Sequence, residues 1–286
     1  MPDQPNTQDL RSANTIRDAL TARFGETLTV DDNLAGLDEL ARIASRRVHR
    51  HYLERDVDPV LLRLLCACAL SAPSKSDLQQ ADILIVSDPD KRRTLSELLP
   101  DQTWMRTAPA FLVFLANGRR LTEISKLRNK PFPNDHLDLF FNTAVDTGIV
   151  LATFLRAADA VGLGCCPISV IRDHAARVTE LLELPPRVIP VAGLCVGWPA
   201  ETSTISPRLS LASTLHQDRY DEGDLAQCID DFDRRRAATH PLNPRDPERW
   251  GKATFYGWSE DKARQFGVPQ CANFGAFVRK QGFRLE

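Results

Sequence analysis

The stretch Val188-Ile189-Pro190-Val191-Ala192-Gly193-Leu194-Cys195-Val196-Gly197-Trp198 carries the strongest strand signal in the sequence. Two shorter β-rich runs, residues 83–86 and 111–115, are bounded by turn signals and predict buried strands. Only four or five strands are interleaved with helical patterns, which favours an α+β layered domain around one mixed sheet. No G-x-G-x-x-G motif follows a strand, so the dinucleotide-binding fingerprint is absent.

Several segments between these strands have the apolar spacing of helices. Asp58-Pro59 is a typical helix start, with proline in the first turn. The apolar run that follows is nearly continuous as far as Leu70, so this helix is expected to be buried. The predicted helices are residues 15–24, 37–47, 59–70, 142–161 (closed by Gly162 as a C-cap) and 175–184.

The composition argues against several classes of protein. The 286 residues include 36 Lys and Arg against 38 Asp and Glu, a formal net charge of -2, whereas nucleic-acid binders normally carry a basic excess. No apolar run approaches the roughly 20 residues that span a bilayer, and the polar N-terminus lacks the apolar stretch of a signal peptide. We therefore expect a cytoplasmic protein with no nucleic-acid or membrane partner.

The cysteines predict neither a disulfide framework nor a metal site. Their number is odd and they are scattered, which is a poor basis for disulfides. No histidine pair or second CxxC completes a zinc site, so we expect buried cysteines that act as small hydrophobes. The seven are Cys66, Cys68, Cys165, Cys166, Cys195, Cys228 and Cys271.

Four segments could carry chemistry. The arginines of Arg46-Arg47-Val48-His49-Arg50-His51-Tyr52 could surround a phosphate, because a planar guanidinium binds oxygen pairs, although a bare basic cluster is more often a solvated helix end. Ser71-Ala72-Pro73-Ser74-Lys75-Ser76-Asp77-Leu78-Gln79 offers hydroxyls and N–H groups to a planar cofactor, or is a plain loop. Residues 162–172 form a glycine-flanked apolar segment that could approach a ring system. The fourth segment is Gly197-Trp198-Pro199-Ala200, followed by Ser206-Pro207-Arg208-Leu209.

In this order and spacing the four segments resemble the nitroreductase family of flavoproteins. The first is similar to R-R-[ST]-x-R-x-[FY], and residues 72–79 are similar to its A-P-S-x-S-x-L-Q turn. The later segments resemble the NADPH-linked, oxygen-insensitive nitroreductases and flavin reductases, with their GLGG…R, GL-C-GWPA and P-R-L motifs. The resemblance covers roughly residues 37–286. It implies a layered α+β fold with a central mixed, largely antiparallel sheet flanked by helices, in an intertwined homodimer.

The resemblance also implies a set of ligands for FMN, with NADPH or NADH as electron donor. Arginines would hold the phosphate and ribityl side, and the serine turn would contact the polar side of the flavin. The segment after residue 166 would pass the reactive N5 edge. The implied cofactor-binding residues are Arg46, Arg47, Arg50, Ser74, Lys75, Ser76, Gln102, Pro167, Ile168, Ser169, Val170 and Arg208. Arg172 and Asp77 would face the nucleotide or substrate.

The sequence departs from the family pattern at several of these positions. Val48 replaces the usual Ser or Thr, Ser206 stands where lysine is common, and Asp77 adds an anion near the flavin. Ser169-Val170 replaces a Gly-Gly pair, and valine does not adopt positive φ cheaply. These changes affect the expected substrate choice and FMN affinity more than the fold.

The expected function is FMN-dependent NAD(P)H oxidation, with two electrons passed through flavin N5 to nitroaromatics, quinones or flavins. No side chain is required as a catalytic residue. The alternatives are a non-catalytic FMN carrier or sensor, and a dehalogenase-type or flavin-fragmenting reaction on the same fold. Arg234-Arg235-Arg236 could receive the 2′-phosphate of NADPH, but a basic run is more often a solvated helix face.

Three regions are expected along the chain. Residues 1–34 would form an N-terminal extension, residues 35–215 the FMN-binding core, and residues 216–286 a C-terminal extension on the core or on the partner subunit. The helix predicted at 142–161 is the candidate subunit interface. On one of its faces lie Val145, Ile149, Ala152 and Leu155.

Overall fold

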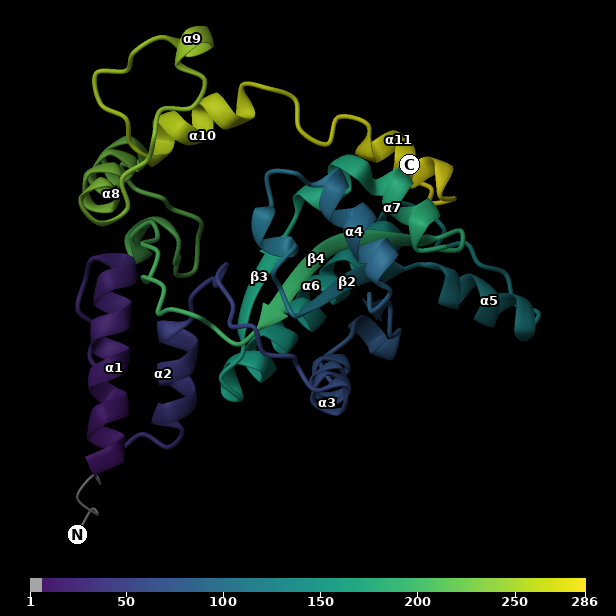
Figure 1. Ribbon diagram of the computed structural model, residues 1–286, viewed down its shortest axis with the longest axis horizontal. Helices are drawn as coiled ribbons and strands as arrows, with labels where there is room; N and C mark the ends of the chain where they lie inside the picture. Colours follow the sequence, from purple (N-terminus) through teal and green to yellow (C-terminus); the bar gives the residue numbers. More distant parts are fainter. Residues whose placement is uncertain (1–6) are drawn as a thin grey trace. The chain divides into compact units, whose positions relative to one another are not determined.

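The computed structural model describes residues 7–286, so the first six residues of the predicted extension lie outside the described part. Its sheet has the strand order β1-β2-β4-β3 and helices on both faces (Figure 1). The strands are β1 (Ala81–Ile85), β2 (Ala110–Asn117), β3 (Gly164–Ile168) and β4 (Val188–Gly197). Every neighbouring pair in this sheet is antiparallel. The prediction of a mixed sheet was therefore wrong, while the α+β layered class and the largely antiparallel pairing are confirmed.

Strand β2 explains how the sheet supports two cores. All eight of its residues are buried, and successive side chains of a strand point to opposite faces. Phe111, Val113 and Leu115 enter one core cluster. Leu112 and Phe114 enter the cluster on the other face, so a continuous apolar run was the correct signal for a strand covered on both sides.

Helices α3 (Pro59–Leu70) and α6 (Leu137–Ala160) cover one face of the sheet. Leu62 and Leu65 of α3 pack with Phe154 of α6 in the same cluster. Val60 is 75% and Leu64 57% exposed in the single chain. The expectation that α3 is buried is therefore confirmed on the side that faces the sheet and wrong on the other side, because apolar residues surround this helix.

The face of helix α6 that carries Val145 and Ile149, the candidate subunit interface, lies away from the core of the single chain. The buried side of α6 includes Asp146, Val150 and Phe154. Val145 is 43% and Ile149 36% exposed. Among the described residues, α6 alone has the length and apolar composition that could cross a membrane, which the sequence reading had not expected of any segment. Core helices share this length and composition, and in α6 the Phe154 ring lies edge-on to the ring of Phe114 in the sheet, with 5.8 Å between the ring centroids.

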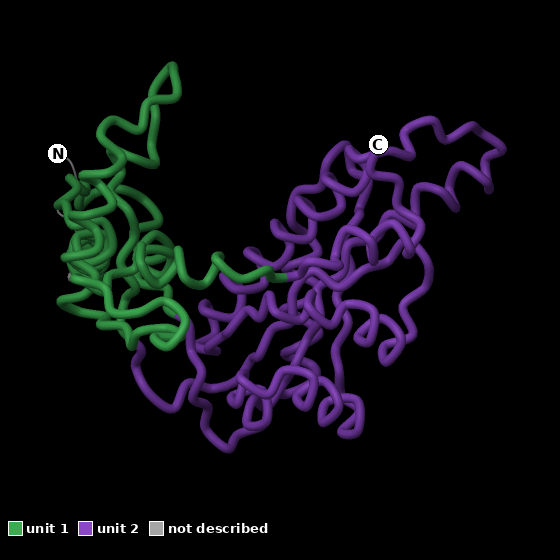
Figure 2. Tube along the Cα trace, turned by 90° about the horizontal axis from the view of Figure 1, so that it is seen from above, with its two compact units in different colours: residues 1–47, 204–270 green, residues 48–203, 271–286 purple. Residues whose placement is uncertain are grey.

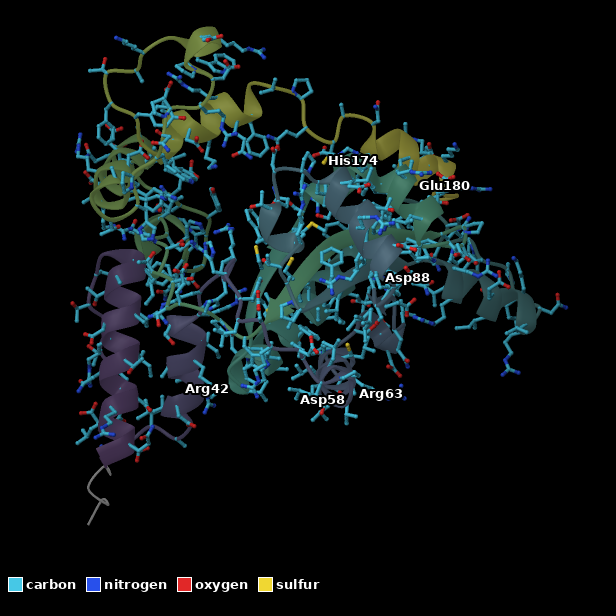
Figure 3. All side chains as sticks on the ribbon, viewed as in Figure 1. Arg42, Asp58, Arg63, Asp88, His174 and Glu180 are labelled. Atoms are coloured by element: carbon cyan, nitrogen blue, oxygen red, sulfur yellow. The ribbon has the colours of Figure 1, made fainter. Side chains whose placement is uncertain are left out.

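The opposite face is covered by α4 (Pro89–Leu98), the short helix η3 (Val170–His174) and α7 (Ala175–Leu181). Two helices on the two sides of the sheet share one start signal: Asp58 caps α3 and Asp88 caps α4, each followed by proline (Figure 3). The Asp88 carboxylate accepts backbone N–H groups of the first turn, which lowers the pKa of that carboxyl. These caps are local, and so they were readable from the sequence.

The chain forms two compact units (Figure 2). The first comprises residues 1–47 and 204–270, and the second comprises residues 48–203 and 271–286. In the first unit, α1 (Thr7–Phe24) packs on α2 (Leu37–Ser45), with Ile16 and Leu37 in a small core. The first unit also contains η4 (Leu211–Ser213), α8 (Leu225–Thr239), α9 (Pro247–Trp250) and α10 (Trp258–Phe266). The second contains the sheet, η1 (Lys75–Asp77), η2 (Thr103–Met105), α5 (Arg119–Leu127) and α11 (Phe274–Lys280).

The cysteines are all free thiols. Cys66, Cys165, Cys166 and Cys195 are buried as expected, whereas Cys68 is exposed on α3 and Cys228 and Cys271 are partly exposed, so the expectation was wrong for these three. Burial raises the pKa of the Cys66 thiol to about 11. The buried thiols therefore behave as small apolar side chains.

Candidate functional site

In the first compact unit, Arg23 joins two arginine-bearing segments that are far apart in the sequence. Its Nη2 donates to the carbonyl oxygens of Ala44 at 3.0 Å and Arg46 at 2.8 Å. Its Nη1 donates to the carbonyl of Ser206 at 3.2 Å. The backbone N–H of Arg208 in turn donates to the carbonyl of Arg23 at 2.6 Å. We call Arg23, Arg46, Arg47 and Arg208 the arginine cluster.

The electrostatics of the arginine cluster favour an anion. Burial, followed by the positive charges of Arg208, Arg46 and Arg47, lowers the pKa of the Arg23 guanidinium. Within residues 7–286, the buried Nε of Arg47 has no hydrogen-bond acceptor. A buried cationic donor without an acceptor costs free energy, and guanidinium groups match phosphate oxygens in pairs. The cluster therefore has the charge and the donors for a phosphate group.

Arg235 of helix α8 also binds the backbone of the arginine cluster. Its Nη1 donates to the carbonyl of Arg23 at 3.0 Å and its Nη2 to the carbonyl of Arg208. Burial lowers its pKa. Arg234 pairs with Asp231 at 3.3 Å on the exposed side of the same helix. In the basic run Arg234-Arg235-Arg236, which was considered for the 2′-phosphate of NADPH, the side chain of Arg235 thus donates to backbone carbonyl groups.

In the second unit, the predicted serine turn is held by a carboxylate from the sheet-covering helix α6. Asp146 is 2% exposed. It accepts from Ser74 Oγ at 2.7 Å, from the Lys75 N–H at 3.2 Å and from Gln80 Nε2 at 3.3 Å. The Ser74 hydroxyl also accepts the Gln79 N–H at 2.8 Å. Ser74, expected to contact the flavin, therefore uses its hydroxyl to shape the turn.

The backbone of this turn adopts an uncommon conformation. Ser76, Asp77 and Gln79 have φ of +49°, +55° and +52°, and each non-glycine residue in the left-handed region costs free energy. The exposed Lys75 pairs with Asp138 of α6 at 2.9 Å, and Arg120 donates to the Gln79 carbonyl. These contacts offset the backbone strain and keep the turn in one shape.

A pocket of about 530 Å³ lies against the turn. It is lined by the predicted residues Ser74 and Asp77 together with Arg120 and Asp146. Arg120 is already paired with Asp82 at 2.6 Å. The pocket thus combines turn residues with a pre-paired guanidinium.

The second half of the arginine motif, residues 48–52, lies beside strands β3 and β4. The His49 N–H donates to the Cys165 carbonyl of β3 at 3.1 Å. Tyr52 donates its hydroxyl to the His49 carbonyl at 2.7 Å, and burial raises the pKa of that hydroxyl. Arg50 is exposed and lies 5.0 Å from the ring of Trp104, two residues after Gln102. The structure therefore places Arg50 beside the segment that carries Gln102.

The segment expected beside flavin N5 is the end of β3 and the start of η3. Ile168 is 1% exposed and its side chain belongs to the core, so only its backbone is available to a ligand. Ser169 is exposed, with φ of −84° and ψ of −26°. Arg172 donates to the Val191 carbonyl at 2.7 Å. Val191 is the extra residue of a bulge in β4 opposite β2, so Arg172 satisfies a carbonyl that the ladder leaves out.

Two departures from the family pattern have a common structural effect. Val48 and Val170 both pack, partly buried, against the same core cluster under the sheet. Among the described residues, the left-handed backbone positions include neither Ser169 nor Val170. Glycine is therefore not required at Ser169 or Val170, and the side chains of Val170 and Val48 add packing where the family pattern has glycine and a hydroxyl residue.

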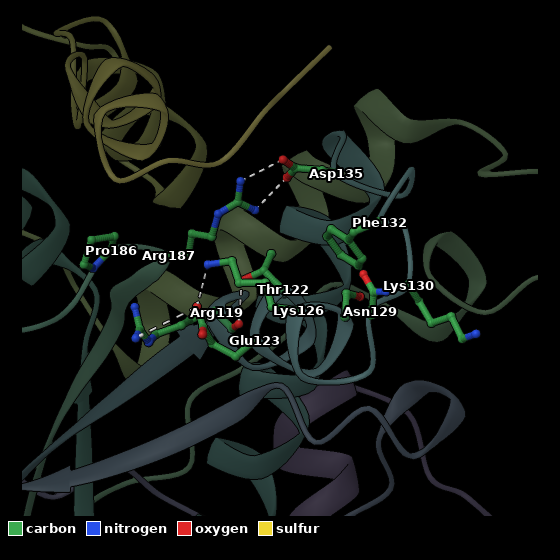
Figure 4. Close-up of a pocket in the computed structure, with 11 residues that line it drawn as sticks. Arg119, Thr122, Glu123, Lys126, Asn129, Lys130, Phe132, Asp135, Pro186 and Arg187 are labelled. Atoms are coloured by element: carbon green, nitrogen blue, oxygen red, sulfur yellow. Dashed lines mark hydrogen bonds and ion pairs between the residues drawn. The ribbon is translucent and has the colours of Figure 1, made fainter.

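A second pocket, of about 650 Å³, lies elsewhere in this unit (Figure 4). Its lining includes Arg187, which makes two 2.7 Å hydrogen bonds to Asp135, and Lys126, which pairs with Glu123 at 3.0 Å. The Arg187 guanidinium holds the pKa of the Asp135 carboxyl below its usual range. None of the predicted site residues lines this pocket. Its charged side chains Arg187 and Lys126 are already paired with Asp135 and Glu123.

The structure therefore groups the predicted residues in separate places. Arg46, Arg47 and Arg208 lie together in the first unit. The turn residues lie together in the second unit, as do Arg50 and the Gln102 segment. Sequence reasoning missed Arg23 and Asp146. The signal for Asp146 was a carboxylate within an apolar helix; for Arg23 no local signal existed.

Two family models match the chain. The model described as the nitroreductase family matches residues 43–198, and that described as the nitroreductase family C-terminal domain matches residues 206–286. The chain is 32% identical to an FMN reductase [NAD(P)H] of Bacillus subtilis, over 85% of this chain and 97% of the relative. It is 33% identical to an oxygen-insensitive NADPH nitroreductase of Salmonella typhimurium, over 62% of this chain and 72% of the relative. The solved structure of B. megaterium NfrA2 superposes with a TM-score of 0.78 at 34% identity, covering 87% of this chain and 98% of that one.

Proposed function

This chain belongs to the nitroreductase family, and we propose that it binds FMN and passes electrons from NAD(P)H to nitroaromatics, quinones or free flavins. The enzyme class is that of an NAD(P)H-dependent flavin oxidoreductase. The observation that carries the cofactor proposal is the arginine cluster. It supplies several guanidinium groups, one of them with a buried donor that has no acceptor among residues 7–286.

The chain's residues fit the phosphate end of FMN. Arg47 and Arg208 would bind the phosphate oxygens, since Arg47 has an unused buried Nε and Arg208 is exposed. Arg46 would add positive charge, because its charge already acts on Arg23. Neutralising this cluster with a dianion would relieve the repulsion among like charges.

In the second unit, the two serines that the resemblance assigns to the flavin would have different roles. The Ser74 hydroxyl is engaged with Asp146 and Gln79, so its role is to hold the turn. Ser76 is exposed at the apex of this turn and is the better candidate for a hydrogen bond to the flavin. The N–H and carbonyl groups near Ser169 would border the ring, because the Ile168 side chain lies in the core.

Bound FMN would supply hydride acceptance and donation at N5. The protein would supply position and charge. The arginine cluster fixes the phosphate, and the Asp146-held turn presents a rigid polar edge. No described residue is needed as an acid or base, because solvent can provide protons to the reduced acceptor.

We also propose that the chain works as a homodimer. The supporting observation is the apolar face of α6, where Val145 and Ile149 are 43% and 36% exposed, together with Val60 and Leu64 of α3. Exposed apolar side chains at this spacing on packed helices are typical of a protein interface. A second copy of the chain would cover them.

The test is an absorption spectrum of the purified, FMN-reconstituted protein, before and after anaerobic addition of NADPH. The expected result is a set of flavin bands that bleach within seconds and return when a nitroaromatic or quinone is added. Flavin bands that NADPH does not bleach would favour the carrier or sensor alternative. A protein that cannot be reconstituted with FMN would refute the proposal.

Two matched variants sharpen this test. Arg208→Met is expected to weaken FMN binding by about 10- to 100-fold, the effect of losing one charge-assisted hydrogen bond to phosphate. Arg42→Met is the control, because Arg42 is an exposed helix arginine paired with Glu39 and Asp38 (Figure 3). A panel that adds halogenated aromatics to the acceptors separates reductase activity from a dehalogenase-type reaction.

A further inference from the structure

Arg23 lies in a part of the chain that the family models do not match. Those models begin at residue 43, and Arg23 is in the last turn of α1. Its guanidinium bonds to three carbonyl oxygens in two segments, residues 44–46 and residue 206. The N-terminal helix is therefore connected directly to the backbone on both sides of the arginine cluster.

The hydrogen bonds of Arg23 indicate which kind of role it has. Three of the five N–H donors of this guanidinium go to main-chain carbonyl groups, so most of its hydrogen-bonding capacity holds the backbone. Its own carbonyl accepts from the Arg208 N–H and from Arg235 Nη1. Arg23 thus holds the main chain from both its ends, while Arg47 and Arg208 keep side-chain donors available.

The position of Arg23 needs compensation, because it is a half-buried cation among other cations. The carbonyl dipoles of Ala44, Arg46 and Ser206 supply part of it. The negative end of the α1 dipole, where Arg23 lies, supplies more. What remains is a surplus of positive charge that a bound anion would balance.

We propose that Arg23 is a positioning residue for the phosphate of FMN: it fixes the backbone of residues 44–46 and 206–208 so that Arg46, Arg47 and Arg208 converge on one anion. This inference rests on the proposed function, and it assigns a role to the N-terminal helix. FMN and riboflavin differ by the phosphate alone, so the ratio of their dissociation constants isolates this role.

The experiment measures both dissociation constants by flavin fluorescence on the full-length apoprotein. In wild type FMN is expected to bind more tightly than riboflavin. Arg23→Met is expected to lower that preference at least about tenfold, by misplacing about one charge-assisted hydrogen bond. Arg23→Lys keeps the charge but has one nitrogen in place of the two that reach residue 206 and residues 44–46 separately, so it is expected to lose most of the preference too.

Arg17→Met is the matched control. Arg17 lies on the same helix and bonds to the Val30 carbonyl and Asp32, within the same compact unit but outside the cluster. It is expected to keep the wild-type ratio, and circular dichroism checks that each variant is folded. The salt dependence of FMN binding gives a second reading, since a lost phosphate contact flattens it.

Each outcome decides the inference. Equal weakening of FMN and riboflavin by Arg23→Met, or the same loss in Arg17→Met, would mean that the helix only stabilises the unit, and the inference would fall. A preference kept by Arg23→Lys and lost only by Arg23→Met would make charge, not position, the cause. A wild-type protein that binds neither FMN nor riboflavin would refute the proposed function itself. That result is distinct from the outcomes that refute only the role of Arg23.

Discussion

Replacing Asp146 by alanine tests whether one buried carboxylate holds the serine turn. The change leaves three donors without their acceptor: Ser74 Oγ, the Lys75 N–H and Gln80 Nε2. The Gln80 side chain is fully buried, and a buried donor that loses its acceptor costs about 1–3 kcal/mol. Water can reach the other two donors through the adjoining pocket, so they contribute less.

The expected net loss is about 2–4 kcal/mol of the free energy of unfolding, because relief of the carboxylate's own desolvation offsets part of the cost. At about 2–4 °C per kcal/mol for a large domain, that lowers Tm by about 4–16 °C. Differential scanning calorimetry on the apoprotein measures it. The Asp146→Asn variant is expected to fall between wild type and Asp146→Ala, since the buried Oε1 of Gln80 has no partner among the described residues and can accept from the new amide.

Asp138→Ala is the control for this prediction. Asp138 lies on the same helix and contacts the same turn through Lys75, but its side chain is exposed. Its removal is expected to leave Tm close to wild type, because exposed ion pairs contribute little. An Asp146→Ala protein that unfolds at the temperature of wild type, or no lower than Asp138→Ala, would refute the argument that the buried acceptor holds the turn.

Three further predictions concern other parts of the chain. A Cβ at Gly197 would come within 2.5 Å of a proline ring, so Gly197→Ala is expected to cost about 1–3 kcal/mol in urea unfolding, whereas Gly148→Ala, with open space around it, should not destabilise. Hydrogen bonding to Arg187 lowers the pKa of Asp135 below its ordinary value of 3.8 (Figure 4). The stability that this pair adds is complete above pH 3.8 and is lost as the pH falls through the lowered pKa. Asp135→Asn should therefore flatten the acid side of the curve of stability against pH, and an unchanged curve would count against the pair. Ile149→Glu should convert the proposed dimer to monomer in size-exclusion chromatography, and elution with wild type would exclude this helix face as the interface.

The sequence alone predicted the elements whose signals are local. Strand β4 was expected at residues 188–198 and is found at Val188–Gly197; α3 begins at Pro59, directly after its Asp58 cap. Apolar periodicity, caps and turn residues act over a few positions, so they are readable without a fold. Boundaries were less exact: α1 and α6 begin earlier than expected, at Thr7 and Leu137.

Which strands pair, and which side of a helix is covered, could not be predicted from these local signals. An apolar run predicts a buried strand but does not name its neighbour, so the uniformly antiparallel order β1-β2-β4-β3 came only from the structure. The same holds for α3, whose composition is apolar all round although the sheet covers one side of it. Which face is covered depends on contacts with residues far away in the sequence.

The residues of the candidate site also fall into those predicted from the sequence and those found only in the structure. Motif order and spacing singled out the arginines, the serine turn and Arg208, because these residues lie in short, recognisable segments. Only the folded chain paired Arg23 with the carbonyls of residues 44, 46 and 206, and Asp146 with the turn at Ser74. The physical reason is that a hydrogen bond between residues 21 to 183 positions apart leaves no periodic trace in the sequence, whereas its energy depends on burial that the tertiary structure creates.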